Sequence, residues 1–73
     1  MNNIITYEIT KKIAVLSNKN SITKEVNFIK FNDSEEKLDI RKWDHSNNRK
    51  LQGISLTIDE ALKLIEALDT IRP

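Results

Sequence analysis

Aromatic and basic side chains gather in residues 24–43, and these side chains are the best suited to binding chemistry. Phe31 and Trp43 offer flat rings on which nucleic-acid bases can stack. Lys24 and Arg41 offer cations that can neutralise phosphates. The combination predicts a surface for single-stranded nucleic acid. The same side chains also suit a surface for a protein partner, and their spacing alone does not decide between the two.

Two alternating runs, over residues 26–31 and 38–43, position these side chains on either side of a polar turn at residues 32–35. Successive side chains of a strand point to opposite faces of a sheet, and Asn, Asp and Ser favour tight turns. The opposite face to the aromatic and basic one is apolar and is expected to be buried. It carries Val26, Phe28, Leu38 and Ile40. The aromatic and basic face is expected to be displayed, so we predict that the Trp43 ring is partly accessible to solvent.

The first part of the chain predicts further β structure. Residues 4–9 and 13–16 are rich in β-branched residues, which favour strands. Residues 10–12 between them are either a bulge in one long strand or a turn between two short strands. Residues 18–21 are polar and predict the loop that leads into the central pair of strands.

The last part of the chain predicts one more strand and a helix. Residues 44–50 are polar and without periodicity, which indicates a loop. Residues 50–56 predict a strand in which Gly53 marks a bulge or a close approach of two backbones. Thr57 and Glu60 have the spacing of a capping box at a helix start. The order of elements therefore predicts an α+β fold with one C-terminal helix.

The predicted helix carries more apolar surface than one partner needs. A surface helix usually has an apolar arc of about 100°, and this helix exceeds it with Ala61, Leu62, Leu64, Ile65, Ala67, Leu68 and Ile71. A chain of 73 residues forms one small domain, residues 1–73, that has little core of its own. We therefore expect a homodimer with Leu64, Leu68 and Ile71 at the interface. The alternative is a helix buried on more than one side within its own subunit.

Composition and charge exclude several classes of function. Residues 1–50 hold ten Lys/Arg and seven Asp/Glu, so the net charge of this part is +3. Residues 51–73 hold two Lys/Arg and four Asp/Glu, so the net charge of this part is −2. There is no cysteine and only one histidine, so no metal site is expected. No nucleophile–base set or glycine-rich phosphate loop is present, so we expect no catalytic residues, no cofactor and no small-molecule substrate. Without a signal peptide or an apolar span, a cytoplasmic protein without membrane contact is expected.

Six short segments, taken in order, resemble a known family. They are Tyr7-Glu8-Ile9, residues 13–17, residues 23–27, Phe31-Asn32, Asp39-Ile40-Arg41 with Trp43, and residues 53–57 leading into the helix. This arrangement resembles the C-terminal domain of the eukaryotic transcriptional coactivator called positive cofactor four. It is closer still to that coactivator's small bacterial relatives, the YdbC-like proteins.

The resemblance implies a homodimer of curved, antiparallel four-stranded sheets, each followed by a helix near the twofold axis. It implies binding of single-stranded DNA with little sequence preference, in transcription regulation or in the handling of exposed DNA strands, with RNA as an alternative ligand. The chain departs from the family pattern at Ile22 and Gln52, where a ring and a lysine are usual. Nearby cations at Arg49 and Lys50 supply part of the missing charge. The expected contacts are Lys24, Asn27, Phe31, Arg41, Trp43, Arg49 and Lys50.

Overall fold

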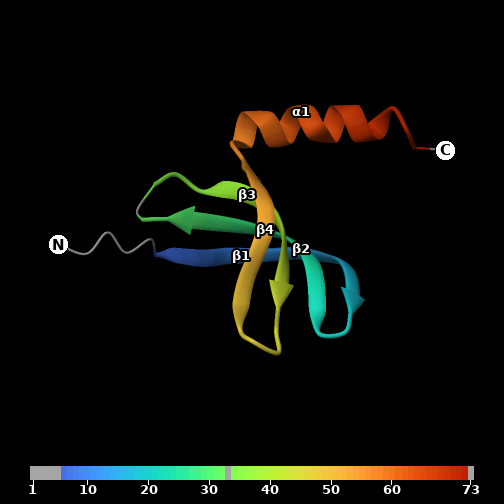
Figure 1. The fold of residues 1–73 in the computed structure, drawn as a ribbon. Coiled ribbons are helices and arrows are strands. Elements are labelled where there is room, and N and C mark those ends of the chain that lie inside the picture. Colours follow the sequence, from blue (N-terminus) through green and yellow to red (C-terminus); the bar gives the residue numbers. More distant parts are fainter. Residues whose placement is uncertain (1–5, 33, 73) are drawn as a thin grey trace.

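The described residues, 6–32 and 34–72 of a computed structural model, form four strands and one helix (Figure 1). The elements are β1 (Tyr7–Lys19), β2 (Ile22–Phe31), β3 (Lys37–Asp44), β4 (Arg49–Leu56) and α1 (Ile58–Asp69). The strands lie in the order β1-β2-β3-β4, and neighbours are antiparallel. The predicted α+β fold, a four-stranded antiparallel sheet followed by one C-terminal helix, is confirmed. Residues 4 and 5 of the first predicted strand and Asp33 of the predicted turn lie outside the described residues.

Strand β1 is one long strand with bulges, which resolves the open alternative at residues 10–12. Its 13 residues face the 10 residues of β2, and the register shifts three times, between Ile9 and Lys11, Lys12 and Ala14, and Val15 and Ser17. Bulges bend a strand and increase its twist. The strand also runs further than expected, to Lys19, and turns at residues 20–21, which both have positive φ. Two such residues form the tight turn that suits a twisted hairpin.

The predicted polarity of the sheet faces is confirmed, but the predicted exposure of one face is wrong. Val26, Phe28, Leu38 and Ile40 share the face that α1 covers, yet all four remain only half-buried. The opposite face is closed: Ile29 and Asp39 are 0% exposed and Asn27 is 1% exposed. Trp43 is 9% exposed, so the prediction of a partly accessible ring is wrong. The bulged, coiled sheet folds this face inward, so it is concave and hidden rather than displayed.

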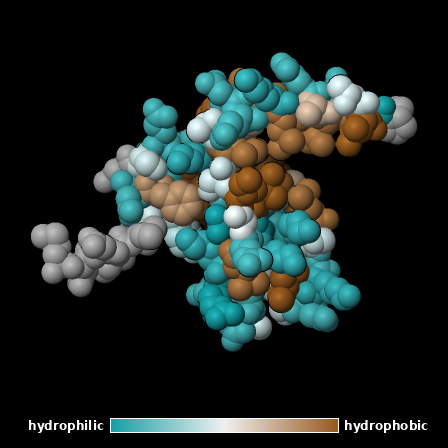
Figure 2. All heavy atoms as spheres, turned by 45° about the horizontal axis from the view of Figure 1, so that its top comes forward, coloured by the Kyte–Doolittle hydropathy of each residue, from teal (hydrophilic) through white to brown (hydrophobic). Residues whose placement is uncertain are grey.

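Helix α1 begins as its sequence predicts and leaves an apolar groove beside the sheet. Glu60 N donates to Thr57 Oγ1 at 3.2 Å and Thr57 N donates to Glu60 Oε1 at 2.8 Å, which completes the capping box. The helix runs along one end of the sheet and projects beyond it (Figure 1). The groove between them has a volume of about 500 Å³ and is lined by apolar residues from β1, β2, β3 and α1. Figure 2 shows apolar side chains gathered along the helix and continuing onto the sheet.

The helical part of the described chain has no segment with the length and apolar character of a membrane span. Among all the described residues, strands and loops included, no group of three or more His, Cys, Asp or Glu side chains is arranged to hold a metal ion.

Candidate nucleic-acid interface

Three aromatic rings, Tyr7, Phe31 and Trp43, meet at one end of the concave face, and we call them the aromatic cluster. The ring centres of Tyr7 and Phe31 are 6.4 Å apart, and those of Tyr7 and Trp43 are 5.8 Å apart. Tyr7 and Phe31 are paired across β1 and β2. Trp43 lies on β3, and the coiling of the sheet brings its ring next to that of Tyr7. The cluster thus brings together two predicted stacking residues and adds Tyr7. Its pairing with Phe31 is a long-range register that the sequence pattern does not reveal.

Lys50 covers part of the aromatic cluster. Its Nζ lies 4.8 Å from the ring centre of Tyr7 and 5.2 Å from that of Phe31, within the range of cation–π attraction. Lys50 stands directly opposite Trp43 in the β3–β4 register, so both side chains lie on the concave face. The indole Nε1 of Trp43 is buried and has no hydrogen-bond partner among the described residues.

The turn that leads to Lys50 is held by Asp44. Its carboxylate accepts hydrogen bonds from the backbone N–H groups of Ser46 and Asn47, from the Ser46 hydroxyl and from the Asn47 amide. Hydrogen bonds from the Asn47 and Ser46 side chains lower the pKa of Asp44. The predicted polar loop is therefore an ordered turn, and it fixes the backbone at the start of β4.

Arg41 forms its hydrogen bonds with groups inside the protein. Its Nε and Nη2 donate to the two carboxylate oxygens of Asp39 at 2.6 and 2.7 Å, and its Nη1 donates to the Leu51 carbonyl at 3.1 Å. Ser55 Oγ donates to Asp39 Oδ1 at 2.8 Å. Asp39 is wholly buried and the Arg41 side chain is 12% exposed. The guanidinium that was expected to contact phosphate therefore compensates a buried carboxylate in this structure.

Gly53 lies opposite Arg41 and allows β3 and β4 to approach closely. A Cβ atom at Gly53 would lie 2.0 Å from the Arg41 Cβ and 2.6 Å from the Ile40 carbonyl oxygen. A register shift separates the Arg41 pair from the Trp43 pair. The glycine thus marks both of the features that the sequence left open, a bulge and a close backbone approach.

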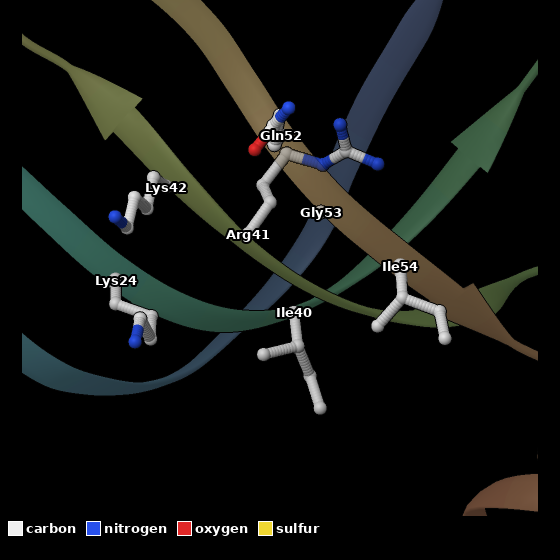
Figure 3. A pocket seen from close by; sticks show the side chains of 7 residues that line it. All are labelled: Lys24, Ile40, Arg41, Lys42, Gln52, Gly53 and Ile54. Atoms are coloured by element: carbon white, nitrogen blue, oxygen red, sulfur yellow. The ribbon is translucent and has the colours of Figure 1, made fainter.

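Two lysines, Lys24 and Lys42, face each other across β2 and β3 on the side of the sheet that also carries α1. Figure 3 shows them side by side, with Ile40 next along the pocket and Ile54 beyond it. They contribute to an open pocket of about 260 Å³ together with Gln52. Neither lysine forms an ion pair with the described residues. Like charges directly opposite in a sheet repel, so this pair is suited to an anion placed between them.

The predicted contacts are therefore divided between two faces. Phe31, Trp43 and Lys50 come together, whereas Lys24 lies on the other face beside Lys42, which the sequence analysis does not single out. The remaining three predicted contacts join neither group: Arg41 binds Asp39 inside the protein, and the other two are Asn27 and Arg49. Asn27 is 1% exposed and donates to Glu25 at 3.4 Å, and Arg49 is exposed opposite Asp44. Their roles as contacts stay predictions.

Glu25 forms a polar cluster with Thr23, Asn27 and His45 on the concave side. Thr23 Oγ1 donates to the Glu25 carboxylate, and His45 Nε2 lies 3.1 Å from the same Oε2 atom. His45 N also donates to the Ser21 carbonyl at 2.9 Å, which ties the end of β3 to the β1–β2 turn. Burial raises the pKa of Glu25, but hydrogen bonds from Thr23, Asn27 and His45 outweigh this effect and leave the pKa below its usual value.

Replacing Glu25 by glutamine is expected to lower the free energy of unfolding at neutral pH by on the order of 1 kcal/mol, because hydrogen bonds to a charged acceptor are lost. The folded pKa is depressed, so the wild-type advantage is present above the usual value of 4.5 and is lost as the pH falls through the folded value. Urea unfolding of both proteins from neutral to acidic pH measures the difference. Glu35→Gln, at an exposed position, is the control. A difference independent of pH would contradict the assignment.

The three predicted interface residues, two on α1 and one just after it, lie along the apolar groove or beyond its end. Leu64 is half-buried in it, Leu68 lines it while remaining 52% exposed, and Ile71, just after the helix, is 75% exposed. Leu62 and Ile65 are also more than half exposed. The single chain thus leaves most of the predicted interface uncovered.

The chain matches the model of a known protein family. A family model described as Transcriptional Coactivator p15 (PC4) matches residues 18–67, which is more than half of the 73-residue chain. The matched segment extends from the last two residues of β1 through β4 and most of α1. No curated protein matches the chain.

Proposed function

Because the chain belongs to the family of Transcriptional Coactivator p15 (PC4), we propose that it is a non-catalytic protein that binds single-stranded DNA with little sequence preference. The observation that carries the proposal is the pair Lys24 and Lys42, two cations held directly opposite each other at an open pocket without a carboxylate partner among the described residues. A phosphate between them removes their repulsion. Contacts of this kind are independent of base sequence.

Bases would be bound separately from phosphates. The aromatic cluster supplies ring faces for stacking, which tolerates any base because every base has a π-face. The lysine pair and the aromatic cluster lie on opposite sides of the same β2–β3 hairpin. A nucleic-acid strand that contacts both the lysine pair and the aromatic cluster would pass around this hairpin. RNA offers the same phosphates and bases, so a comparison of DNA and RNA oligonucleotides decides between the two ligands.

The proposal includes a homodimer that covers the apolar groove. The groove of about 500 Å³ and the exposed side chains of Leu62, Ile65 and Leu68 would otherwise contact water. Small domains often add buried area by association. A second copy that presents the same helix would bury both grooves at once, as a twofold interface requires. We propose further that the chain is one of the family's small bacterial, YdbC-like members and acts in the cytoplasm, in transcription regulation or in the handling of exposed DNA strands.

Titration with a fluorescent oligonucleotide at several salt concentrations tests the proposed function. The logarithm of the association constant should fall with the logarithm of salt, by about 0.7 per phosphate contact. Lys24→Ala and Lys42→Ala should each reduce this slope by about 0.7 and weaken binding to all sequences alike. Lys63→Ala, on α1 and outside the pocket, is the matched control.

Single-stranded and duplex DNA of the same sequence should be compared in that experiment. Weaker binding of the duplex is expected, because paired bases cannot stack on the aromatic cluster. An affinity that does not respond to salt would contradict the proposal and favour a protein-interaction module, the alternative that the sequence leaves open.

A further inference from the structure

We propose that Lys50 occupies, in the free protein, the place that a nucleic-acid base takes in the complex, and that its displaced ammonium then contacts a phosphate. The inference rests on the proposed function and deepens it. It names the stacking subsite, formed by Tyr7 and Phe31, and the side chain that must leave it. Nothing in the family match assigns a role to either Tyr7 or Lys50.

The geometry makes Lys50 and a base mutually exclusive. The ammonium lies 4.8 Å from the ring centre of Tyr7 and 5.2 Å from that of Phe31. A stacked base would contact the same rings at about 3.5–4.0 Å between carbon atoms. The Lys50 ammonium occupies the space next to the two rings that a stacked base would need. It therefore has to move before a base can stack there. Tyr7 is 43% exposed, so part of this residue is accessible to a ligand from solvent.

The side chain of Lys50 can leave without disturbing the fold. Asp44 holds the preceding turn through hydrogen bonds to Ser46 and Asn47, and the pairing with Trp43 fixes the Lys50 backbone. The four-carbon stem is flexible, and the ammonium forms no ion pair with the described residues. The cation–π attraction that is lost is replaced by base stacking and by a phosphate contact.

Trp43 gives a second, independent indication of a ligand at this place. Its Nε1 is a buried donor that has no partner among the described residues, which is rare in folded proteins. The residue directly opposite Trp43 is Lys50. Removal of the lysine side chain would uncover the neighbourhood of the indole, and the edge of a base carries carbonyl and ring-nitrogen acceptors.

Nuclear magnetic resonance of the full chain tests the displacement. In the free protein the Hε protons of Lys50 should be shifted upfield of those of the other lysines, because they lie over two aromatic rings. On saturation with a thymidine oligonucleotide this shift should move into the range of the other lysines. An unshifted Lys50 signal in the free protein, or a shift that persists in the complex, would overturn the inference. Absence of any binding would instead contradict the proposed function.

A salt series with Lys50→Ala separates the two parts of the role. The variant should lose about 0.7 from the salt slope, because one phosphate contact is lost. It should also bind more tightly than the wild type at high salt, because no cation has to leave the rings, so the two lines should cross. A variant that is weaker at every salt concentration would make Lys50 a phosphate contact alone and overturn the displacement. Lys63→Ala should follow the wild-type line.

Discussion

Replacement of Arg41 by alanine is expected to destabilise the protein by about 3–5 kcal/mol, because it leaves a buried carboxylate without its partner. Asp39 is 0% exposed and receives two of its hydrogen bonds from the Arg41 guanidinium. In a chain of 73 residues a single core rarely supplies more than about 3–5 kcal/mol, so most of the population should be unfolded or close to unfolding. Urea unfolding followed by circular dichroism measures the loss.

Two further variants identify the cause of this loss. Arg41→Lys keeps the charge but not the planar fork that engages both oxygens of Asp39, so an intermediate loss is expected. The double variant Asp39→Ala/Arg41→Ala removes both charges and should lose less than the sum of the two single variants. Wild-type stability in Arg41→Ala would show that the guanidinium is free in solution and available to phosphate, as the sequence first indicated.

Replacement of Leu68 by aspartate is expected to dissociate the proposed dimer and, because folding would depend on it, to unfold most of the protein. Leu68 is 52% exposed in the single chain, so a charge there would cost little in a monomer. In a dimer that covers the groove, each subunit would bury an unpaired carboxylate at a cost of about 3–5 kcal/mol. Sedimentation velocity and thermal unfolding, both at several protein concentrations, measure the change. Leu64→Asp and Ile71→Asp should behave in the same way.

A charge reversal elsewhere on the helix is the control for that substitution. Lys63 is exposed and does not line the groove, so Lys63→Asp should leave both mass and stability near the wild-type values. A wild-type protein that sediments as a folded monomer at micromolar concentration would contradict the dimer. In that case the exposed apolar residues of α1 would need another explanation.

The sequence predicted best where short-range rules determine the structure. The capping box needs only Thr57 and Glu60 at the correct spacing, and both of its hydrogen bonds are present. The alternation in β2 and β3 correctly separated Val26 and Phe28 from Phe31 and the other residues of the opposite face. These features depend on positions a few residues apart, which the sequence displays directly.

The sequence could not predict which face is closed. Alternation divides side chains into two sets, but their exposure depends on the coiling of the whole sheet and on any second subunit. Asn27 and Asp39 are buried because the concave face folds over them, whereas Val26 remains half-buried. Trp43 was therefore placed on a displayed surface and lies in a packed cluster instead. Substitution of Trp43 is therefore expected to affect folding.

Long-range register explains why the sequence pattern does not reveal two of the candidate contact residues. Lys42 becomes notable only because it stands opposite Lys24, and Tyr7 only because it reaches both Phe31 and Trp43. The register of β1 changes three times along its length, so no fixed spacing connects its residues to those of β2. The only sequence signal for Tyr7 is that it is one more aromatic residue, within the strand predicted at residues 4–9.

The bulges of β1 also disfavour aggregation of the protein through its exposed strand edge. β1 is an outer strand of the sheet, and a long, flat outer strand is a template on which other chains can add strands and aggregate. Residues 10, 13 and 16 are skipped by the register, so the free edge is irregular at three-residue intervals and has no continuous, evenly spaced ladder to offer. Lys11 and Lys12 add charge at the middle of this edge. The irregularity that shapes the concave face therefore also protects the molecule against fibril-like growth.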